Sequence, residues 1–238
     1  MVTSRDVEYE ADGVTMVGRL ALPDGDGPAP AVLVCHEANG LDDWQRSRAE
    51  QLAELGYVAL AMDYHGGGQA FTDPGPMFER IGELGADPDR LRAIATTALD
   101  VLLAEPRADA DRAAAIGYCF GATVAMELAR TGADLKAVVG FHPGLGSARP
   151  ADSANIRAKV LMCIGQQDTF IDAQLRMAFI DEMTSADVDW QVHLYGDGVR
   201  HSFTHPNAGE SGLPGLEYHP VAAARAWKAM QDLFDEVF

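Results

Sequence analysis

Segments typical of buried strands alternate along this chain with segments that have the spacing of amphipathic helices. Strand patterns, most of them continuous apolar runs, fall at residues 31–35, 58–62, 113–117, 137–141, 159–164 and 190–195. Helical patterns fall at residues 44–55, 89–104, 120–130, 172–183 and 221–237. This alternation predicts an α/β fold with a mostly parallel central sheet and helices on both faces.

The N-terminal segment has a different pattern. Residues 7–22 form two short β-rich runs joined at Ala11-Asp-Gly13. Asp-Gly between such runs is a strong signal for a hairpin. We therefore expect an N-terminal antiparallel hairpin at one edge of the sheet.

The glycines and prolines punctuate the chain and do not form a linker. All 24 glycines and 12 prolines are spread between the apolar runs, which is typical of turns. With 238 residues and 47% hydrophobic composition, we expect a single domain over residues 1–238. Residues 66–88 show no clear pattern, and we expect them to form a lid-like segment.

The charge of the chain argues against two classes of partner. A formal net charge of −18 repels nucleic-acid phosphates and anionic lipid headgroups, so we expect neither nucleic-acid nor membrane binding. The N-terminus lacks the apolar core of a secretion signal, which predicts a cytoplasmic protein. The widely spaced Cys35, Cys119 and Cys163 are expected to be free thiols.

The segment Gly117-Tyr-Cys-Phe-Gly121 lies where a predicted strand meets a predicted helix. It has the form of the Gly-x-Ser-x-Gly nucleophile elbow, with cysteine in the place of serine. The two glycines avoid Cβ clashes in a tight turn, and the helix N-terminus favours negative charge. The spacing therefore predicts that Cys119 is a nucleophile.

The alternative for Cys119 is that it packs as a small buried hydrophobe, as most free cysteines do. The apolar strand, the flanking glycines and the following helix coincide only at Cys119, which favours the nucleophile there. Cys35 and Cys163 lie inside apolar runs, and we expect both to be buried.

A cysteine nucleophile needs a base, and the base needs an orienting carboxylate. In folds with this elbow the order along the chain is nucleophile, acid, histidine. Asp168 follows the predicted strand 159–164, and His201 follows the predicted strand 190–195. Both loops leave the carboxyl ends of strands, where the sites of such sheets form. We predict that Asp168 and His201 form a catalytic triad with Cys119.

Other residues could fill these roles. Asp172 is explained as a helix N-cap, and Asp197 lies too near His201 in a glycine-rich turn. Four more histidines fall in loops at the same edge of the sheet, namely His36, His65, His142 and His205. The position of His201 after the last strand favours it over these four.

A metal site was the other possibility for His201 and His205, which have the spacing of an i,i+4 pair. Pro206 disfavours a helix there, and no further ligand is tied to the pair by spacing. We therefore predict no metal.

The loop after residues 31–35 faces the elbow in this arrangement. It can supply an oxyanion-hole donor, the backbone N–H of Ala38, beside the backbone N–H of Phe120. Glu37 in the same loop is either a solvated surface residue, as most lone glutamates are, or part of the site.

These segments together resemble the dienelactone hydrolases, cysteine-based members of the α/β-hydrolase fold. The resemblance covers essentially the whole chain. Its segments are Cys35-His-Glu-Ala-Asn-Gly-Leu41, Met62-Asp-Tyr-His-Gly-Gly-Gly68, the elbow, residues 165–168 and His201-Ser-Phe203.

The resemblance implies an α/β-hydrolase fold and hydrolysis of a small ester or lactone. The reaction would proceed through a thioester on Cys119, with His201 as base, Asp168 as its partner and no cofactor. The resemblance also implies that Glu37 lies near the resting thiol and helps to control its ionisation.

The resemblance extends to substrate contacts, for which we expect Tyr64, Arg80 and His205. In dienelactone hydrolases arginines bind the substrate carboxylate, and one of them stands four residues after the catalytic histidine. That position is His205 in this chain, and Arg80 is the counterpart of the other arginine. Since histidine lacks the permanent, bidentate charge of arginine, a different ester, lactone or thioester is compatible with the resemblance.

Two other functions compete with hydrolysis. The fold could serve as a ligand-binding or regulatory protein that has lost the reaction, because fold does not secure function. Alternatively, Cys119 could sense oxidants, although the sequence offers no nearby resolving cysteine.

Overall fold

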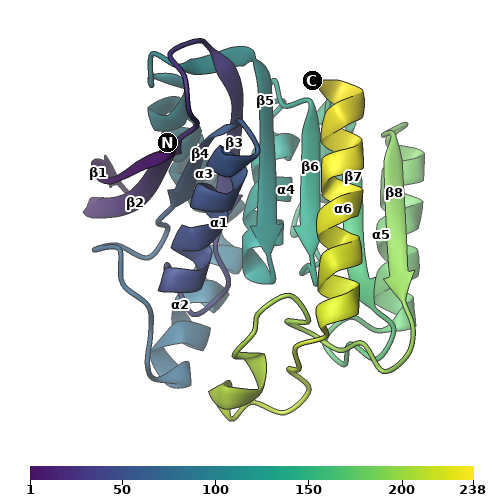
Figure 1. Cartoon of the computed structure of the whole chain (residues 1–238). Coiled ribbons are helices and arrows are strands. Elements are labelled where there is room, and N and C mark those ends of the chain that lie inside the picture. Colours follow the sequence, from purple (N-terminus) through teal and green to yellow (C-terminus); the bar gives the residue numbers. More distant parts are fainter.

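The computed structural model describes the backbone of residues 1–238 and every side chain except that of Ser211. The described residues form one eight-stranded sheet with the order β1-β2-β4-β3-β5-β6-β7-β8 (Figure 1). The strands are β1 (Thr3–Ala11), β2 (Val14–Leu22), β3 (Ala29–Cys35), β4 (Val58–Met62), β5 (Ala108–Tyr118), β6 (Ala137–Phe141), β7 (Lys159–Gly165) and β8 (Trp190–Tyr195).

The N-terminal hairpin and the parallel sheet are both confirmed. β1 pairs with β2 and β2 with β4 in antiparallel register, whereas every pair from β4 to β8 is parallel. Asp12 and Gly13 connect β1 to β2 with φ of 54° and 72°, the left-handed conformation that a two-residue hairpin turn requires.

Helices cover both faces of the sheet. They are α1 (Asp43–Glu54), α2 (Pro74–Ala86), α3 (Pro88–Leu103), α4 (Phe120–Arg130), α5 (Ala173–Ser185) and α6 (Pro220–Val237), with the 3₁₀ turns η1 (Pro150–Asn155) and η2 (Ala208–Ser211). In Figure 1, α1 and α6 lie in front of the sheet and α3, α4 and α5 behind it. This arrangement confirms the predicted α/β-hydrolase fold.

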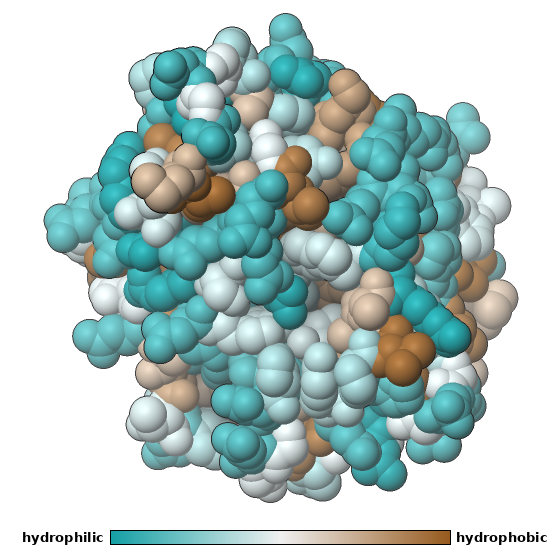
Figure 2. Space-filling view, viewed as in Figure 1, coloured by the Kyte–Doolittle hydropathy of each residue, from teal (hydrophilic) through white to brown (hydrophobic). Residues whose placement is uncertain are grey.

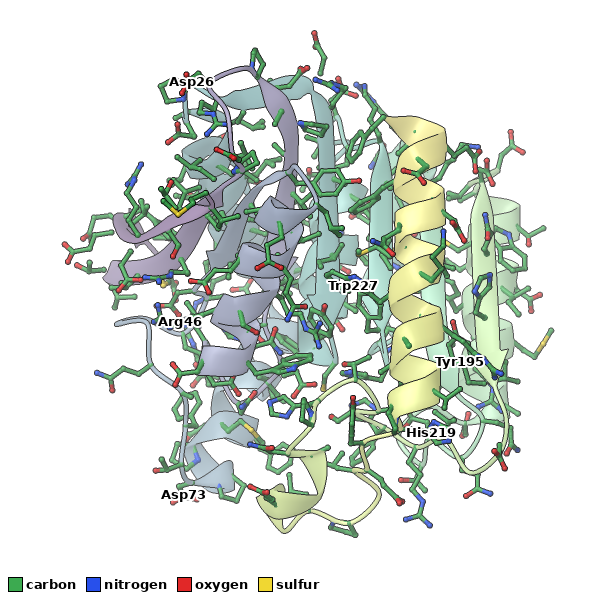
Figure 3. The ribbon with its side chains drawn as sticks, viewed as in Figure 1. Asp26, Arg46, Asp73, Tyr195, His219 and Trp227 are labelled. Carbon is green, nitrogen blue, oxygen red and sulfur yellow. The ribbon has the colours of Figure 1, made fainter. Side chains whose placement is uncertain are left out.

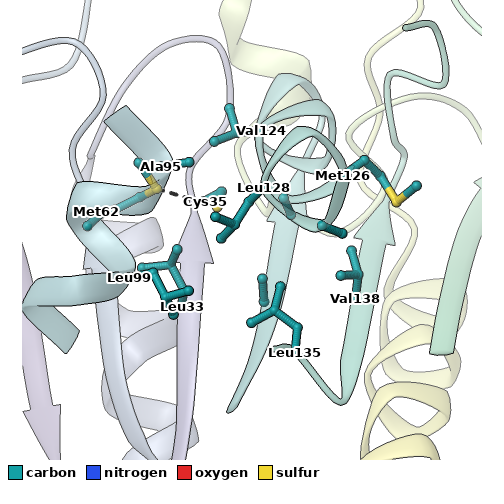
Figure 4. Packing of buried hydrophobic residues seen from close by; sticks show 14 of the residues in the cluster. Leu33, Cys35, Met62, Ala95, Leu99, Val124, Met126, Leu128, Leu135 and Val138 are labelled. Carbon is teal, nitrogen blue, oxygen red and sulfur yellow. Dashed lines mark hydrogen bonds between the residues drawn. The ribbon is translucent and has the colours of Figure 1, made fainter. Parts of the chain in front are cut away.

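The sheet divides the interior into two hydrophobic cores. Successive side chains of a strand point to opposite faces, so Leu33 and Cys35 pack against α3 and α4, whereas Val32 and Val34 pack against α1 and α6. Figure 4 shows the first core, in which the Cys35 thiol lies 3.5 Å from the Met62 sulfur. The prediction that Cys35 is buried is therefore confirmed, and Cys163 is buried as well.

The loop after β4 is organised by one carboxylate. Asp63 accepts hydrogen bonds from four backbone N–H groups, at 2.7 to 3.1 Å, which belong to Val17, His65, Gly66 and Gly68. These bonds tie the β4 exit to the hairpin and fix the backbone on either side of residue 64.

The expected lid-like segment 66–88 contains a helix that the sequence pattern did not predict. Asp73 accepts from the N–H of Gly75 as N-cap, and Pro74 stands at the first helical position of α2, where its missing N–H costs nothing. Leu84 of α2 is fully buried in the first core. The helix is thus anchored at its C-terminal half and extends along the carboxyl edge of the sheet.

The loops at the carboxyl edge of the sheet lie close together. The strands β3 to β8 end at the lower edge in Figure 1, where α2 and the segment that leads into α6 also lie. Figure 3 shows Asp73 and His219, beside the starts of α2 and α6, at this edge. Trp227 of α6 lies on the side toward α1, with the Arg48 guanidinium 5.2 Å from its ring centre.

The outer surface agrees with the composition. The face in Figure 2 is mostly hydrophilic, with apolar atoms in small separate groups, as the net charge of −18 leads one to expect. None of the described helices is both long and apolar enough to span a bilayer.

Candidate active site

The turn between β5 and α4 holds Cys119 in a strained conformation. Its φ of 52° and ψ of −118° are rare for a residue with a side chain. A Cβ at Gly117 would lie 2.2 Å from the carbonyl oxygen of Gly121, and a Cβ at Gly121 would lie 2.2 Å from that of Cys35. Both positions therefore require glycine, and the Cys119 thiol lies half-buried on the wall of a cavity.

Two backbone N–H groups border the cavity beside this thiol. Phe120 is the first residue of α4, so its N–H has no partner within the helix. Among the described residues, neither this N–H nor that of Ala38 donates to a protein acceptor. Both residues line the cavity, so two donors are available there for a bound oxygen.

The loop that carries Ala38 is held from beneath through its carbonyl groups. The Tyr64 hydroxyl lies 2.9 Å from the carbonyl oxygens of both His36 and Glu37 and donates to them. His65 Nε2 donates to the carbonyl of Ala38 at 2.9 Å. These contacts hold the backbone N–H of Ala38 in a fixed place.

His201 is oriented by Asp168, which has almost no solvent contact. The Nδ1–H of His201 donates to Asp168 Oδ2 at 2.7 Å. The other carboxylate oxygen of Asp168 accepts from the N–H groups of Phe170 at 2.9 Å and Ile171 at 3.2 Å. With both carboxylate oxygens engaged, Asp168 can hold the imidazole ring of His201 in one orientation.

His201 and Cys119 are electrostatically paired. Burial works against a charged imidazole, but the charge that Cys119 carries when ionised and the hydrogen bonds to Asp168 and Cys119 outweigh burial and raise the pKa of His201 to about 10. The three residues come from three loops at the carboxyl edge of the sheet, after β5, β7 and β8.

Glu37 is buried beside these groups. Burial raises the pKa of its carboxyl group, against the opposing charges of His205 and His201 and a hydrogen bond from Ser202. Its Oε1 lacks a hydrogen-bond partner within the described structure and lies 3.4 Å from His142 Nε2. A carboxyl group in this position can change its protonation state when charges in the site change.

His142 is a residue of the site that sequence reasoning did not select. Its ring is fully buried, with its centre 5.2 Å from that of His201, and its Nε2 lies 2.8 Å from the Thr204 hydroxyl. Burial lowers its pKa well below the usual value, and the charges of His201 and His205 act in the same direction. His142 is therefore a neutral neighbour of the His201 ring.

His205 also lines the cavity. Its Nε2–H donates to Asp42 Oδ2 at 3.2 Å, and its Nδ1 accepts from the N–H of Asn207 at 3.1 Å. Burial disfavours the charge on His205, but the hydrogen bond to Asp42 outweighs burial and raises its pKa. His201 and His205 thus have different carboxylate partners.

Two of the residues expected to contact substrate lie away from the cavity. Tyr64 is fully buried beneath the Ala38 loop, and Arg80 Nη2 binds Asp12 Oδ2 and the Tyr64 carbonyl oxygen, both at 3.1 Å. Neither side chain lines the cavity. The contact of Arg80 with Asp12 joins residues 68 positions apart, which no local pattern reveals.

The cavity has a volume of about 590 Å³. Besides the predicted residues, it is lined by residues of α2, of the loop before α2 and of the segment after His205, including Phe71, Met77, Phe78, Ile81, Leu213 and Leu216. Met77, Ile81 and Leu84 stand at helical spacing, but the glycines of this segment weaken that signal for α2. Ser202 could have been found from its position next to His201.

Several known proteins are similar to this chain in sequence and fold. The model of the dienelactone hydrolase family matches residues 16–238. A probable 2-oxo-3-(5-oxofuran-2-ylidene)propanoate lactonase of Bradyrhizobium sp is 28% identical over 230 residues, which cover 93% of this chain and 89% of the relative. A carboxymethylenebutenolidase of Pseudomonas sp. (strain P51) is 30% identical over 192 residues, 77% of each chain.

Two solved structures are more similar. One, described as m3DLH, has a TM-score of 0.95 and 44% identity and covers 100% of this chain and 99% of its own. The other, a dienelactone hydrolase-like promiscuous phosphotriesterase from metagenomic libraries, has a TM-score of 0.94 and 42% identity with the same coverage. This chain belongs to the dienelactone hydrolase family and is an ester or lactone hydrolase.

Proposed function

We propose that this hydrolase cleaves small esters or lactones through a thioester on Cys119. The observation that carries the proposal is the position of His201. Its Nδ1 is held by Asp168, while the charge of the Cys119 thiolate raises its pKa. This arrangement favours a thiolate–imidazolium pair, which is the reactive form of a cysteine nucleophile.

The first half-reaction forms the acyl-enzyme. The Cys119 thiolate attacks the carbonyl carbon of the substrate, and the carbonyl oxygen becomes an oxyanion. The N–H groups of Ala38 and Phe120, free of protein acceptors in the described structure, are suited to bind it. When the tetrahedral intermediate collapses, the carbon–oxygen bond breaks and His201 gives its proton to the leaving alkoxide, which leaves a thioester.

The second half-reaction returns the enzyme. His201, now neutral, takes a proton from water, and the hydroxide attacks the thioester carbon. Collapse of the second intermediate breaks the carbon–sulfur bond, releases the acid and restores the thiolate beside the protonated His201. Water is the only co-reactant.

Glu37 has a distinct part in this proposal. A negative charge beside the thiol disfavours the thiolate, whereas a protonated carboxyl group does not. Because burial raises the pKa of Glu37, Glu37 can gain or lose a proton when the neighbouring groups change their charge. We propose that Glu37 thereby controls the ionisation of Cys119.

The test is trapping of the thioester. Native protein mixed with a p-nitrophenyl ester should release a burst of p-nitrophenolate and gain the acyl mass on the peptide that contains Cys119. Cys119→Ala and His201→Ala should each lower kcat/KM at least 10³-fold, on the order expected for a lost nucleophile or base. Activity that survives in both variants would overturn the mechanism, and Cys163→Ala is the control for thiol loss.

A second activity is favoured by one comparison. The phosphotriesterase with 42% identity to this chain suggests that the Cys119 thiolate also attacks the phosphorus of an uncharged phosphotriester. The phosphorus–oxygen bond to the aryloxide would break, and water would then cleave the S-phosphoryl cysteine. Hydrolysis of paraoxon by the native protein, lost in Cys119→Ala, would support this activity.

A further inference from the structure

The lining of the cavity is acidic and lacks a permanent positive charge. Glu37, Asp42 and Asp73 contribute carboxyl groups to it. Among the described lining residues there is no lysine and no arginine. Apart from the imidazole of His201, which is engaged by Asp168, a substrate carboxylate would therefore find like charges and no cation with which to pair.

His205 does not supply the missing cation. Its Nε2–H is taken by Asp42, and its Nδ1 accepts from the N–H of Asn207. Both ring nitrogens thus have protein partners, and no N–H remains for a ligand. If the ring gains a proton, the adjacent carboxylate of Asp42 offsets the charge.

The guanidinium groups of three nearby arginines contact other parts of the protein. Arg80 binds Asp12, and the Arg48 guanidinium stacks 4.2 Å from the centre of the Trp44 ring. Arg176 donates to the carbonyl oxygen of Ile171 at 2.7 Å. None of the three lines the cavity.

Part of the cavity wall is apolar instead. It is formed by Phe71, Met77, Phe78, Ile81, Leu213 and Leu216. Such a wall binds hydrocarbon groups through the hydrophobic effect and offers no compensation for a desolvated charge.

We propose that the site selects esters whose acyl or alcohol group is uncharged and discriminates against esters that carry a carboxylate, with Asp42 and His205 setting this preference. The proposal rests on the proposed hydrolysis at Cys119 and names its substrate class. The proposed substrate class differs from that of the Bradyrhizobium relative, which is named for a propanoate lactone. A like charge in a partly buried site without a counter-ion weakens binding by roughly tenfold or more.

Three matched substrates test the proposal. They are p-nitrophenyl hexanoate, the mono-p-nitrophenyl ester of adipic acid, in which a carboxylate replaces the terminal methyl, and the corresponding adipamate, in which an uncharged amide does so. Rates are corrected with Cys119→Ala, and kcat/KM is compared. We expect the adipate to be at least tenfold poorer than the adipamate, because the two differ in charge and match in size and polarity.

Two variants test whether Asp42 and His205 set the preference for uncharged esters. Asp42→Asn/His205→Arg places an unpaired guanidinium on the wall and should raise the adipate-to-adipamate ratio at least tenfold. Asp42→Asn alone keeps an N-cap for α1 and should raise the ratio about threefold, which preserves the test if the double variant fails to fold. Asp172→Asn is the matched control, since Asp172 caps α5 in the same way and does not line the cavity.

The outcomes separate this inference from the proposed function. An adipate that reacts within threefold of the adipamate would overturn the inference, and an unchanged ratio in both Asp42 variants would overturn the assignment to Asp42 and His205. Equal shifts in Asp172→Asn would mean that only the overall charge matters. Hydrolysis of all three esters that persists in Cys119→Ala would instead refute the proposed function.

Discussion

Replacing Asp168 by asparagine keeps the shape of the side chain, and the surrounding hydrogen bonds determine the effect. Asp168 Oδ1 accepts from the N–H groups of Phe170 and Ile171, so the asparagine oxygen must occupy this position. Its NH₂ group then faces His201 Nδ1, where Oδ2 lies 2.7 Å away in the native protein. Since an NH₂ group only donates, Nδ1 becomes the acceptor and the ring proton moves to Nε2.

This tautomer places the proton on the wrong nitrogen. In the proposed mechanism Nε2 of His201 must accept the proton of the Cys119 thiol. A catalytic histidine held in the wrong tautomer lowers kcat on the order of 10³- to 10⁴-fold, which corresponds to about 4 to 5.5 kcal/mol of transition-state stabilisation. The free energy of unfolding should fall by only about 1 to 2 kcal/mol, because the backbone hydrogen bonds to the oxygen remain.

The assay is kcat/KM for an activated ester together with thermal unfolding of the same preparation. Asp172→Asn removes an equal charge from a helix N-cap and should leave kcat/KM within about twofold of native. An Asp168→Asn variant that unfolds like the native protein and keeps more than a tenth of its kcat/KM would refute the reasoning about the tautomer.

Three further predictions follow from contacts described above. In Gly121→Ala the new Cβ meets the Cys35 carbonyl oxygen at 2.2 Å, so the free energy of unfolding in urea should fall by about 3 kcal/mol or more. Burial opposes the charge on Asp63, but the backbone hydrogen bonds outweigh burial and lower its pKa. The contribution of Asp63 to the free energy of unfolding is therefore present above its unfolded pKa of about 4 and is lost as the pH falls through the folded pKa. Asp63→Asn should thus be less stable at neutral pH and lose less on acidification. Asp42→Asn should lower the pKa of His205, and an NMR titration of the His205 ring would measure this change.

Each of these predictions has a control and a contrary outcome. Gly209→Ala is the control for the first, because a Cβ at Gly209 meets nothing within 4 Å, and equal unfolding free energies for the two variants would contradict the steric argument. Asp26, an exposed residue, provides the control Asp26→Asn for the acid dependence of Asp63. A His205 titration that does not move in Asp42→Asn would show that Asp42 does not set its protonation.

The sequence predicted those parts of the molecule whose signals are local. The Asp12-Gly13 turn, the strand at residues 58–62 and the helix at residues 120–130 have the bounds that their patterns indicated. The loops of Asp168 and His201 could be placed because each follows directly on a strand, and the elbow could be placed because its glycines lie on either side of the junction of β5 and α4. In a parallel sheet, that order along the chain is enough to bring side chains to one edge.

The remaining features depend on contacts that no local pattern contains. α2 was missed because Gly75, Gly82 and Gly85 weaken a helical pattern, and its stability comes from the burial of Leu84 in the first core. The partner of Arg80 could not be predicted because a half-buried arginine pairs with a carboxylate that the fold brings near it, and here the hairpin turn supplies Asp12. Loop residues after strands were predictable, and so was the contact of Asp168 with His201, whereas the contacts of Arg80 and the burial of Leu84 were not.

The strained backbone at Cys119 has a consequence for the evolution of the protein. A residue with a side chain at φ 52° and ψ −118° costs about 1 to 3 kcal/mol relative to one that can adopt this conformation freely. Glycine at position 119 would relieve that strain, so the variants that lose the thiol include some that fold better. Selection for stability alone would therefore remove the cysteine, so its presence is what the proposed role of Cys119 as nucleophile leads one to expect.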